Sequence, residues 1–111
     1  MLKTLTQQYI QAFDTKNIDS IAGLLNETFA LEDPVVKRVE GKNDALKAMQ
    51  KIFDSCDTLS FRAKNIYQDG NITIIEFILE LDQTMLKGTD IIEWDETGKM
   101  KKLRAYLDIP K

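Results

Sequence analysis

The strongest constraint on the fold is a change in the spacing of apolar residues near Cys56. Before this point, apart from one short strand pattern, apolar residues recur at the three- or four-residue spacing of a helix face. After it they alternate with polar residues, which is typical of strands with one buried face. The chain thus runs from helices, a strand and a further helix into an antiparallel meander. This order predicts an α+β domain in which a curved sheet wraps around a long helix.

Two helices are expected before the first strand. Residues 2–14 carry apolar side chains at helical spacing, with Tyr9 on the apolar face. Asn17 is suited to cap the second helix, because its side chain can accept a hydrogen bond from a backbone N–H of the first turn. The expected buried positions of this second helix are Ile18, Ile21, Leu24 and Leu25.

A short strand and a third helix follow. Residues 29–33 predict the strand, which is expected to end at Asp33 because Pro34 cannot donate to a sheet ladder. The segment "VVKRVEG" indicates a bend or a short hairpin, and Asn43 is the expected cap of the third helix. The expected buried positions of that helix are Leu46, Met49, Ile52 and Phe53.

The second half of the chain predicts the meander of strands. These strands cover residues 59–68, 72–82, 84–94 and 99–108. The sequence "QDGN" between the first two is a strong signal for a tight hairpin turn. In the strand over 72–82, one face is expected to carry Ile75, Phe77, Leu79 and Leu81, and the other Ile74, Glu76, Ile78 and Glu80.

Length, charge and residue usage limit the classes of function. The 111 residues suffice for a single domain over residues 1–111, and the net charge of −3 argues against nucleic acid or an anionic membrane as the main partner. We see no signal peptide and no apolar stretch long enough to span a bilayer. The single Cys56 fits a reducing cytoplasm, and the absence of histidine leaves acid–base chemistry to Asp, Glu, Tyr or Lys.

Three segments carry a resemblance to a known family: "YIQAFDTKNIDSIAGLL" from residue 9, "FALEDPV" from residue 29 and "DIIEWDETGKMKKLRAYLD" from residue 90. Together with the order of elements, they resemble the SnoaL-like branch of the NTF2-like superfamily and, more narrowly, bacterial ketosteroid isomerase. The resemblance implies an α+β cone. In such a cone three helices and a bent, mostly antiparallel sheet enclose an apolar pocket, and the outer sheet face commonly forms a dimer.

The resemblance also implies catalytic residues. Ketosteroid isomerase pairs an Asp base with a Tyr and a protonated Asp that donate hydrogen bonds to the enolate oxygen. The base position falls on Asp33, and the donor positions fall on Tyr9 and Asp90. Where the family carries a tyrosine on the third helix that supports the donor tyrosine, this chain has Gln50. The related epoxide hydrolases use an arginine between two acids, and Gly88 takes the matching place here.

Strand alternation supports this placement from the residues themselves. If Ile92 and Trp94 face the core, Asp90 does too, because side chains of a strand repeat every two residues. A carboxyl buried in an apolar wall without a cation tends to stay protonated and can then donate a hydrogen bond. The expected pocket lining is Phe13, Phe29, Leu31, Ile75, Phe77, Leu79, Ile92, Trp94, Leu103, Ala105 and Leu107.

These residues lead to a first hypothesis, an enzyme that moves a proton next to a carbonyl, as an isomerase or a cyclase does. Its ligand is expected to be an apolar, neutral small molecule, and no metal or organic cofactor is implied. Each site residue also has a purely structural interpretation. Tyr9 can be a core tyrosine, Asp33 a strand terminator before Pro34, and Asp90 a solvated residue at a strand entry.

The alternative hypothesis is a non-catalytic module of the same fold, which binds a ligand or forms a dimeric interaction surface. One observation distinguishes the two hypotheses. An open cavity on which Asp33 and Asp90 converge favours the enzyme, whereas a cavity filled by Trp94 favours the module. A homodimer is expected in either case, through outward-facing Ile74, Ile78 and Tyr106.

Overall fold

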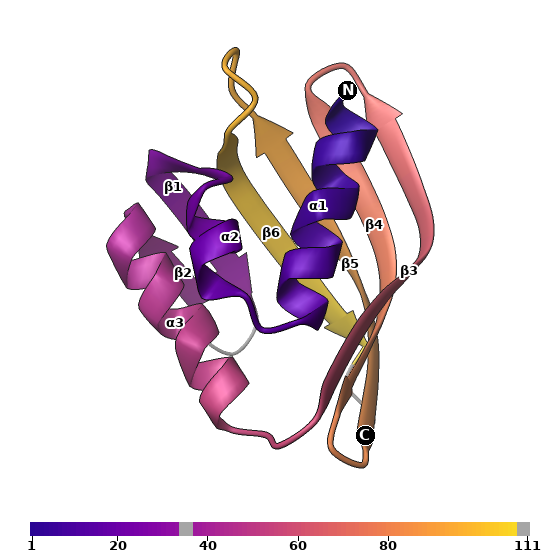
Figure 1. Ribbon diagram of the computed structural model, residues 1–111. Helices are drawn as coiled ribbons and strands as arrows, with labels where there is room; N and C mark the ends of the chain where they lie inside the picture. Colours follow the sequence, from indigo (N-terminus) through magenta and orange to yellow (C-terminus); the bar gives the residue numbers. More distant parts are fainter. Residues whose placement is uncertain (34–36, 109–111) are drawn as a thin grey trace.

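The computed structural model describes residues 1–33 and 37–108, which form helices packed against a curved sheet (Figure 1). The helices are α1 (Leu2–Asp14), α2 (Ile18–Ala22) and α3 (Lys42–Asp54). The strands are β1 (Leu25–Asp33), β2 (Lys37–Glu40), β3 (Leu59–Asp69), β4 (Ile72–Leu81), β5 (Thr84–Trp94) and β6 (Met100–Asp108). Within the described ranges, every helix is too short or too polar to cross a membrane.

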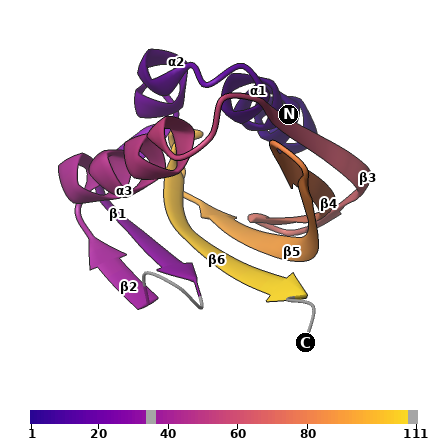
Figure 2. The ribbon, with the colours of Figure 1, turned by 90° about the horizontal axis from the view of Figure 1, so that it is seen from below.

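The described strands form one sheet in the order β2-β1-β6-β5-β4-β3. Neighbouring strands are antiparallel except for β1 and β6, which run parallel. Figure 2 shows the sheet curving around the helices, which lie on its inner face. Helix α1 packs on β3 and β4, and α3 packs on β1 and β2. The predicted α+β cone is therefore confirmed.

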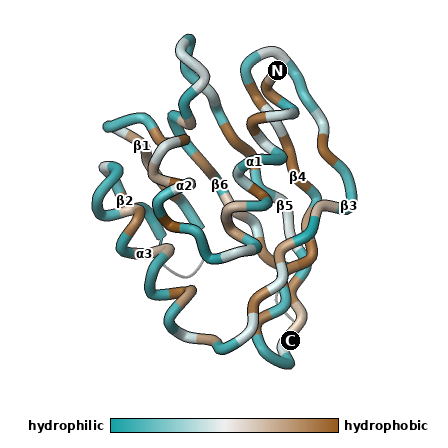
Figure 3. The backbone as a smooth tube through the Cα atoms, in the orientation of Figure 1, coloured by the Kyte–Doolittle hydropathy of each residue, from teal (hydrophilic) through white to brown (hydrophobic). Residues whose placement is uncertain are grey.

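The meander agrees closely with the sequence pattern. The bounds of β3, β4, β5 and β6 lie within one residue of the predicted ones. Burial alternates along β4, where Ile75, Phe77 and Leu79 are buried and the residues between them are partly exposed. Figure 3 shows the hydrophobic positions that recur along this strand. The predicted hairpin turn contains Gly70, whose φ of 60° lies in the left-handed region that favours glycine.

The start of β1 corrects the prediction for the second helix. Leu24 and Leu25 were expected on that helix, but α2 ends at Ala22 and β1 begins at Leu25, well before the predicted start at residue 29. The cause is a distant contact, because Leu25 pairs with Met100 of β6. The backbone N–H of Met100 also donates to the carbonyl of Leu24 at 2.7 Å. Strand pairing therefore places both leucines in the core.

The helix caps agree with the sequence at one position and differ at another. Asn17 caps α2 as predicted, because its side chain accepts a hydrogen bond from the backbone N–H of Ser20 at 3.1 Å. The expected cap of α3 at Asn43 is wrong. That helix begins at Lys42 after Gly41, whose φ of 94° suits glycine alone. The buried face of α3 consists of Ala45, Met49 and Phe53, while Leu46 and Ile52 are only partly buried.

The predicted hairpin after the first strand is present as far as the structure describes it. Strand β2 runs antiparallel to β1, with Lys37 opposite Asp33 and Glu40 opposite Ala30. Pro34, the predicted strand terminator, lies outside the described residues. The described part of the hairpin thus places Asp33 at the end of β1, as expected.

Aromatic rings fill the centre of the cone. Phe61 of β3 is the hub, with its ring centroid 6.2 Å from Tyr9, 4.9 Å from Phe13 and 5.1 Å from Phe77. Phe61 is 4% exposed. At the far end of β5, the indole N–H of Trp94 donates to the Thr73 hydroxyl at 2.9 Å, so this ring is held in place by a buried hydrogen bond.

Candidate active site

Asp90 lies on the inner face of β5, followed at alternate positions by Ile92 and Trp94. It is 4% exposed. Its partners across the sheet are Ile75 on β4 and Ala105 on β6. Alternation along β5 therefore places a carboxyl group among apolar core residues, where an ionised carboxylate loses its hydration.

The parallel pairing of β1 with β6 brings the second acid close to the first. Glu32 of β1 lies opposite Arg104 of β6. The next residue of β6, Ala105, therefore lies between Asp33 and Asp90. Two strand spacings separate the backbones of the two acids by about 10 Å.

The environment keeps Asp90 protonated. Burial, and after it the negative charge of Asp33, raises the pKa of Asp90 from 3.8 to about 8. At neutral pH most Asp90 side chains therefore carry a proton and can donate a hydrogen bond. The charge of Asp33 therefore acts on Asp90 across the width of β6.

Tyr9 joins this pair from α1. It is 3% exposed, and its ring packs against Phe13 and Phe61. Burial raises the pKa of Tyr9 well above its ordinary value, and the charge of Asp90 adds to the shift. The Tyr9 hydroxyl thus keeps its proton. The three residues named from the sequence come from α1, β1 and β5. The charge of Asp33 raises the pKa of Asp90, and ionised Asp90 in turn raises the pKa of Tyr9.

A surface hollow opens beside Asp33, with a volume of about 490 Å³. We call it the β1/β6 hollow. Three residues of the predicted site, Asp33, Ala105 and Leu107, take part in its lining. The full lining is Glu32, Asp33, Lys37, Arg38, Arg104, Ala105, Tyr106 and Leu107. A ligand that reaches Asp33 from the surface therefore meets these side chains.

The other predicted lining residues belong to the packed core. Trp94 is 1% exposed and is hydrogen bonded to Thr73. Tyr9 and Asp90 are likewise buried. The remaining members of this buried set are Phe13, Phe29, Leu31, Ile75, Phe77, Leu79, Ile92 and Leu103. A ligand that touches both Tyr9 and Asp90 must therefore move side chains of the core.

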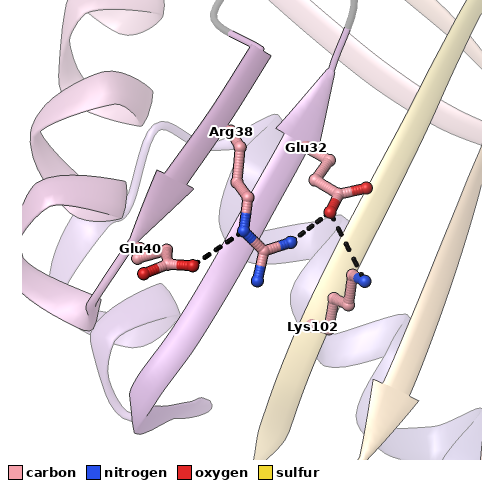
Figure 4. Close-up of polar contacts among 4 residues, drawn as sticks. All are labelled: Glu32, Arg38, Glu40 and Lys102. Carbon is pink, nitrogen blue, oxygen red and sulfur yellow. Dashed lines mark hydrogen bonds and ion pairs between the residues drawn. The ribbon is translucent and has the colours of Figure 1, made fainter.

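Charged residues cover the outer side of the sheet next to the hollow (Figure 4). Arg38 pairs with Glu32 and with Glu40, and Lys102 approaches Glu32 at 3.4 Å. Partial desolvation works to raise the pKa of Glu32, but hydrogen bonds and charges from Lys102 and Arg38 outweigh it and lower the pKa. Glu32 is thus an ion-paired outer residue, while Asp33 next to it lies on the alternate position of the strand.

Two departures from the resembling enzymes have a structural explanation. A Cβ atom at Gly88 would lie 2.5 Å from the carbonyl oxygen of Tyr106 and 2.6 Å from Cζ of Phe77, so an arginine cannot occupy this position without rearrangement. Gln50 donates from Nε2 to Asp54 at 2.9 Å, one turn along α3. The amide is thus engaged on the exposed surface of the helix.

Sequence reasoning missed the basic side chains of the hollow. Lys37, Arg38 and Arg104 all line it, although the sequence indicated no basic partner near the predicted acids. The alternation of β6 does place Arg104 outward, but only the pairing of β1 with β6 sets it beside Glu32. Over residues 1–33 and 37–108, Cys, Asp and Glu side chains form no cluster of three that could hold a metal ion.

Comparison with known proteins gives a family match. The model of the SnoaL-like domain family matches residues 6–103. A search of curated proteins finds no match.

Solved structures share the fold at low sequence identity. A proposed ketosteroid isomerase from Kribbella flavida is 19% identical, with 99% of this chain and 79% of that chain covered and a TM-score of 0.87. A proposed SnoaL-like polyketide cyclase from Shewanella denitrificans is 12% identical, with coverages of 96% and 90% and a TM-score of 0.82. An LEH-like epoxide hydrolase from M. tuberculosis is 16% identical, with coverages of 95% and 80% and a TM-score of 0.77. Proteins with different named activities thus share this fold.

The raised pKa of Asp90 predicts how stability depends on pH. The folded state holds a proton that the unfolded state releases, so the free energy of unfolding should fall as pH rises from about 4 to about 8. Below this window the carboxyl is protonated in both states, and above it the carboxyl is ionised in both, so its contribution no longer changes. Asp90→Asn should weaken the decline and be at least as stable as the wild type at neutral pH.

Urea unfolding across this pH range measures the effect. Asp69→Asn serves as the control, because it removes an exposed acid from the end of β3 and should keep the wild-type decline. An unchanged pH profile in Asp90→Asn, or marked destabilisation at neutral pH, would contradict a buried and protonated Asp90.

Proposed function

The chain belongs to the SnoaL-like domain family, and from that premise we propose that it is a ketosteroid-isomerase-like enzyme. It moves a proton next to a carbonyl group of an apolar small molecule, as an isomerase or a cyclase. The observation that carries this proposal is the burial of the Asp90 carboxyl on the inner face of β5, with Asp33 on the other side of β6; this arrangement raises the pKa of Asp90. An acid that keeps its proton next to a second carboxyl group can supply a hydrogen-bond donor beside a base.

Each residue has a defined role in the proposed reaction. The Asp33 carboxylate takes a proton from the carbon next to the ligand carbonyl, and the electron pair of the broken C–H bond moves toward the carbonyl oxygen. Protonated Asp90 and Tyr9 donate hydrogen bonds to the oxygen as it becomes negative. Asp33 then returns the proton to another carbon in an isomerisation. Tyr9 and Asp90 suit this role because both hold their protons at neutral pH.

The route of the ligand follows from burial. Asp33 lines the β1/β6 hollow, whereas Asp90 and Tyr9 lie in the core behind it. The carbonyl end of the ligand therefore enters past Ala105 and Leu107, and the ring packing around Tyr9 yields to it. The proposal therefore requires that ligand binding changes the environment of the Phe61 and Tyr9 rings.

A non-catalytic module is the second candidate, and the packing of the core favours it. Tyr9, Asp90 and Trp94 are each no more than 4% exposed. If the core does not open, the hollow binds a ligand beside Asp33 and no reaction follows. The module differs from the enzyme in a measurable way, because it predicts binding without turnover.

We also propose a reducing compartment, the cytoplasm, as the place where the protein works. Its one cysteine, Cys56, is buried and free, with Sγ 3.6 Å from the carbonyl oxygen of Ile52. A chain with a single cysteine cannot form an internal disulfide, so an oxidising environment would not stabilise its fold in that way.

The outer sheet face generates a prediction about assembly. Ile74 and Ile78 lie on the outward face of β4, and Tyr106 of β6 is 55% exposed. Apolar side chains on a sheet face favour a two-fold contact with a second copy. Light scattering at micromolar concentration should give about twice the chain mass of 12.7 kDa, and Ile78→Glu should shift the mass toward the monomer. A monomer mass for the wild type would contradict the proposed dimer.

The catalytic role of Asp33 is tested by Asp33→Asn. The variant keeps the size of the side chain and removes the base, so the rate of enolisation of an apolar β,γ-unsaturated ketone should fall by at least about a hundredfold. The rate is followed by the ultraviolet absorbance of the conjugated product. Asp69→Asn provides a matched control that changes the same charge at the end of another strand and should retain the wild-type rate.

Two results would overturn the enzymatic proposal in different ways. Equal turnover by the wild type and Asp33→Asn would make Asp33 a strand terminator only. No turnover by either protein, with the ketone still bound, would favour the non-catalytic module.

A further inference from the structure

The β1/β6 hollow carries an uneven set of charges. Three cationic side chains, Lys37, Arg38 and Arg104, line it together with two acids, Glu32 and Asp33. One more cation than anion stands around an opening whose other lining residues are Ala105, Tyr106 and Leu107. The lining therefore combines an apolar wall with an excess of positive charge, which suits an organic molecule with a single negative group.

Partners within the chain already occupy two of these charges. Glu32 pairs with Arg38 and with Lys102, and Arg38 also pairs with Glu40 at 2.8 Å (Figure 4). Arg38 thus lies between two carboxylates. These two carboxylates largely balance the charge of Arg38. The excess positive charge of the hollow therefore comes from Lys37 and Arg104.

Arg104 is the cation with an unmet requirement. Its Nε atom is buried and has no hydrogen-bond partner in the described part of the chain. Buried N–H groups in folded proteins nearly always donate to an acceptor, because an unpaired one loses its hydrogen bond to water without replacement. Arg104 lies opposite Glu32 at the point where β1 ends, and it lines the hollow. An acceptor on a bound molecule would satisfy the Nε–H once the Arg104 side chain shifts to expose it to the hollow.

We propose that the β1/β6 hollow binds the carboxylate group of an organic monoanion through Arg104, with the apolar body of the ligand on the exposed ring of Tyr106, which shares the outer face of β6 with Arg104. This inference does not depend on the proposed function, because Arg104 lies on the outer face of β6 and Asp90 on the inner face of β5. It differs from the sequence-based expectation of a neutral ligand, which stays a prediction. A dianion such as phosphate fits less well, since Glu32 and Asp33 line the same hollow.

Octanoate and octanamide provide the first test on the wild-type protein. They share the same chain and differ in the charge of the head group. Isothermal titration calorimetry at low salt should show octanoate binding at least about tenfold more tightly, which is the scale of a charge-assisted hydrogen bond. Equal affinities, or tighter binding of octanamide, would overturn the inference without any variant.

Two variants locate the binding group. Arg104→Gln should weaken octanoate by about tenfold and leave the affinity for octanamide within about twofold. Lys101→Gln removes the same charge from an exposed position on the same strand, outside the hollow, and should leave both affinities unchanged. Equal weakening of octanoate by the two variants would show a general effect of charge and would contradict a site at Arg104.

The outcome for the ligand is separable from the outcome for catalysis. Tight octanoate binding that depends on Arg104 supports the anion site even if no ketone is enolised. Enolisation of a neutral ketone by a protein that does not prefer octanoate would retain the proposed function and remove the anion site.

Discussion

The parallel pairing of β1 with β6 is the interaction on which the candidate site depends. It sets Glu32 opposite Arg104, and the next position of β6 places Ala105 between Asp33 and Asp90. A slip of one residue would turn Asp33 toward the outer face and Glu32 toward the core. The proposed base Asp33 and the proposed donor Asp90 would then face opposite sides of the sheet. The register of this pair therefore determines the chemistry of the site.

The local and alternating features of the chain were predictable from sequence. Alternation along β5 placed Asp90 on the inner face, and the strand ends at Asp33 and Trp94 were correct. The start of β1 at Leu25 was not predictable, because it depends on pairing with Met100, far along the chain. The basic residues that line the hollow were not predictable either, because their position also depends on pairing between strands far apart in the sequence. From sequence alone, Arg104 is an outward-facing residue of the last strand. Only the pairing of β1 with β6 places it at the hollow.

The site holds two opposing physical requirements. Apolar packing raises the pKa of Asp90 and makes it a donor, and the same packing buries Tyr9 and Asp90 away from the β1/β6 hollow. A catalytic protein must open this packing for its ligand, which costs part of the binding free energy. A binding module has no such cost. Whether this protein acts as a catalyst or as a binding module therefore depends on how readily the aromatic rings around Phe61 move.

The central claim is that Asp90 holds its proton because it is buried beside the negative charge of Asp33. Carbon-13 NMR of the Asp90 carboxyl as a function of pH tests it most directly. We expect a midpoint at about 8 in the wild type and a lower midpoint in Asp33→Asn, because that variant removes the neighbouring charge. A wild-type midpoint near the ordinary value of 3.8 would contradict the account.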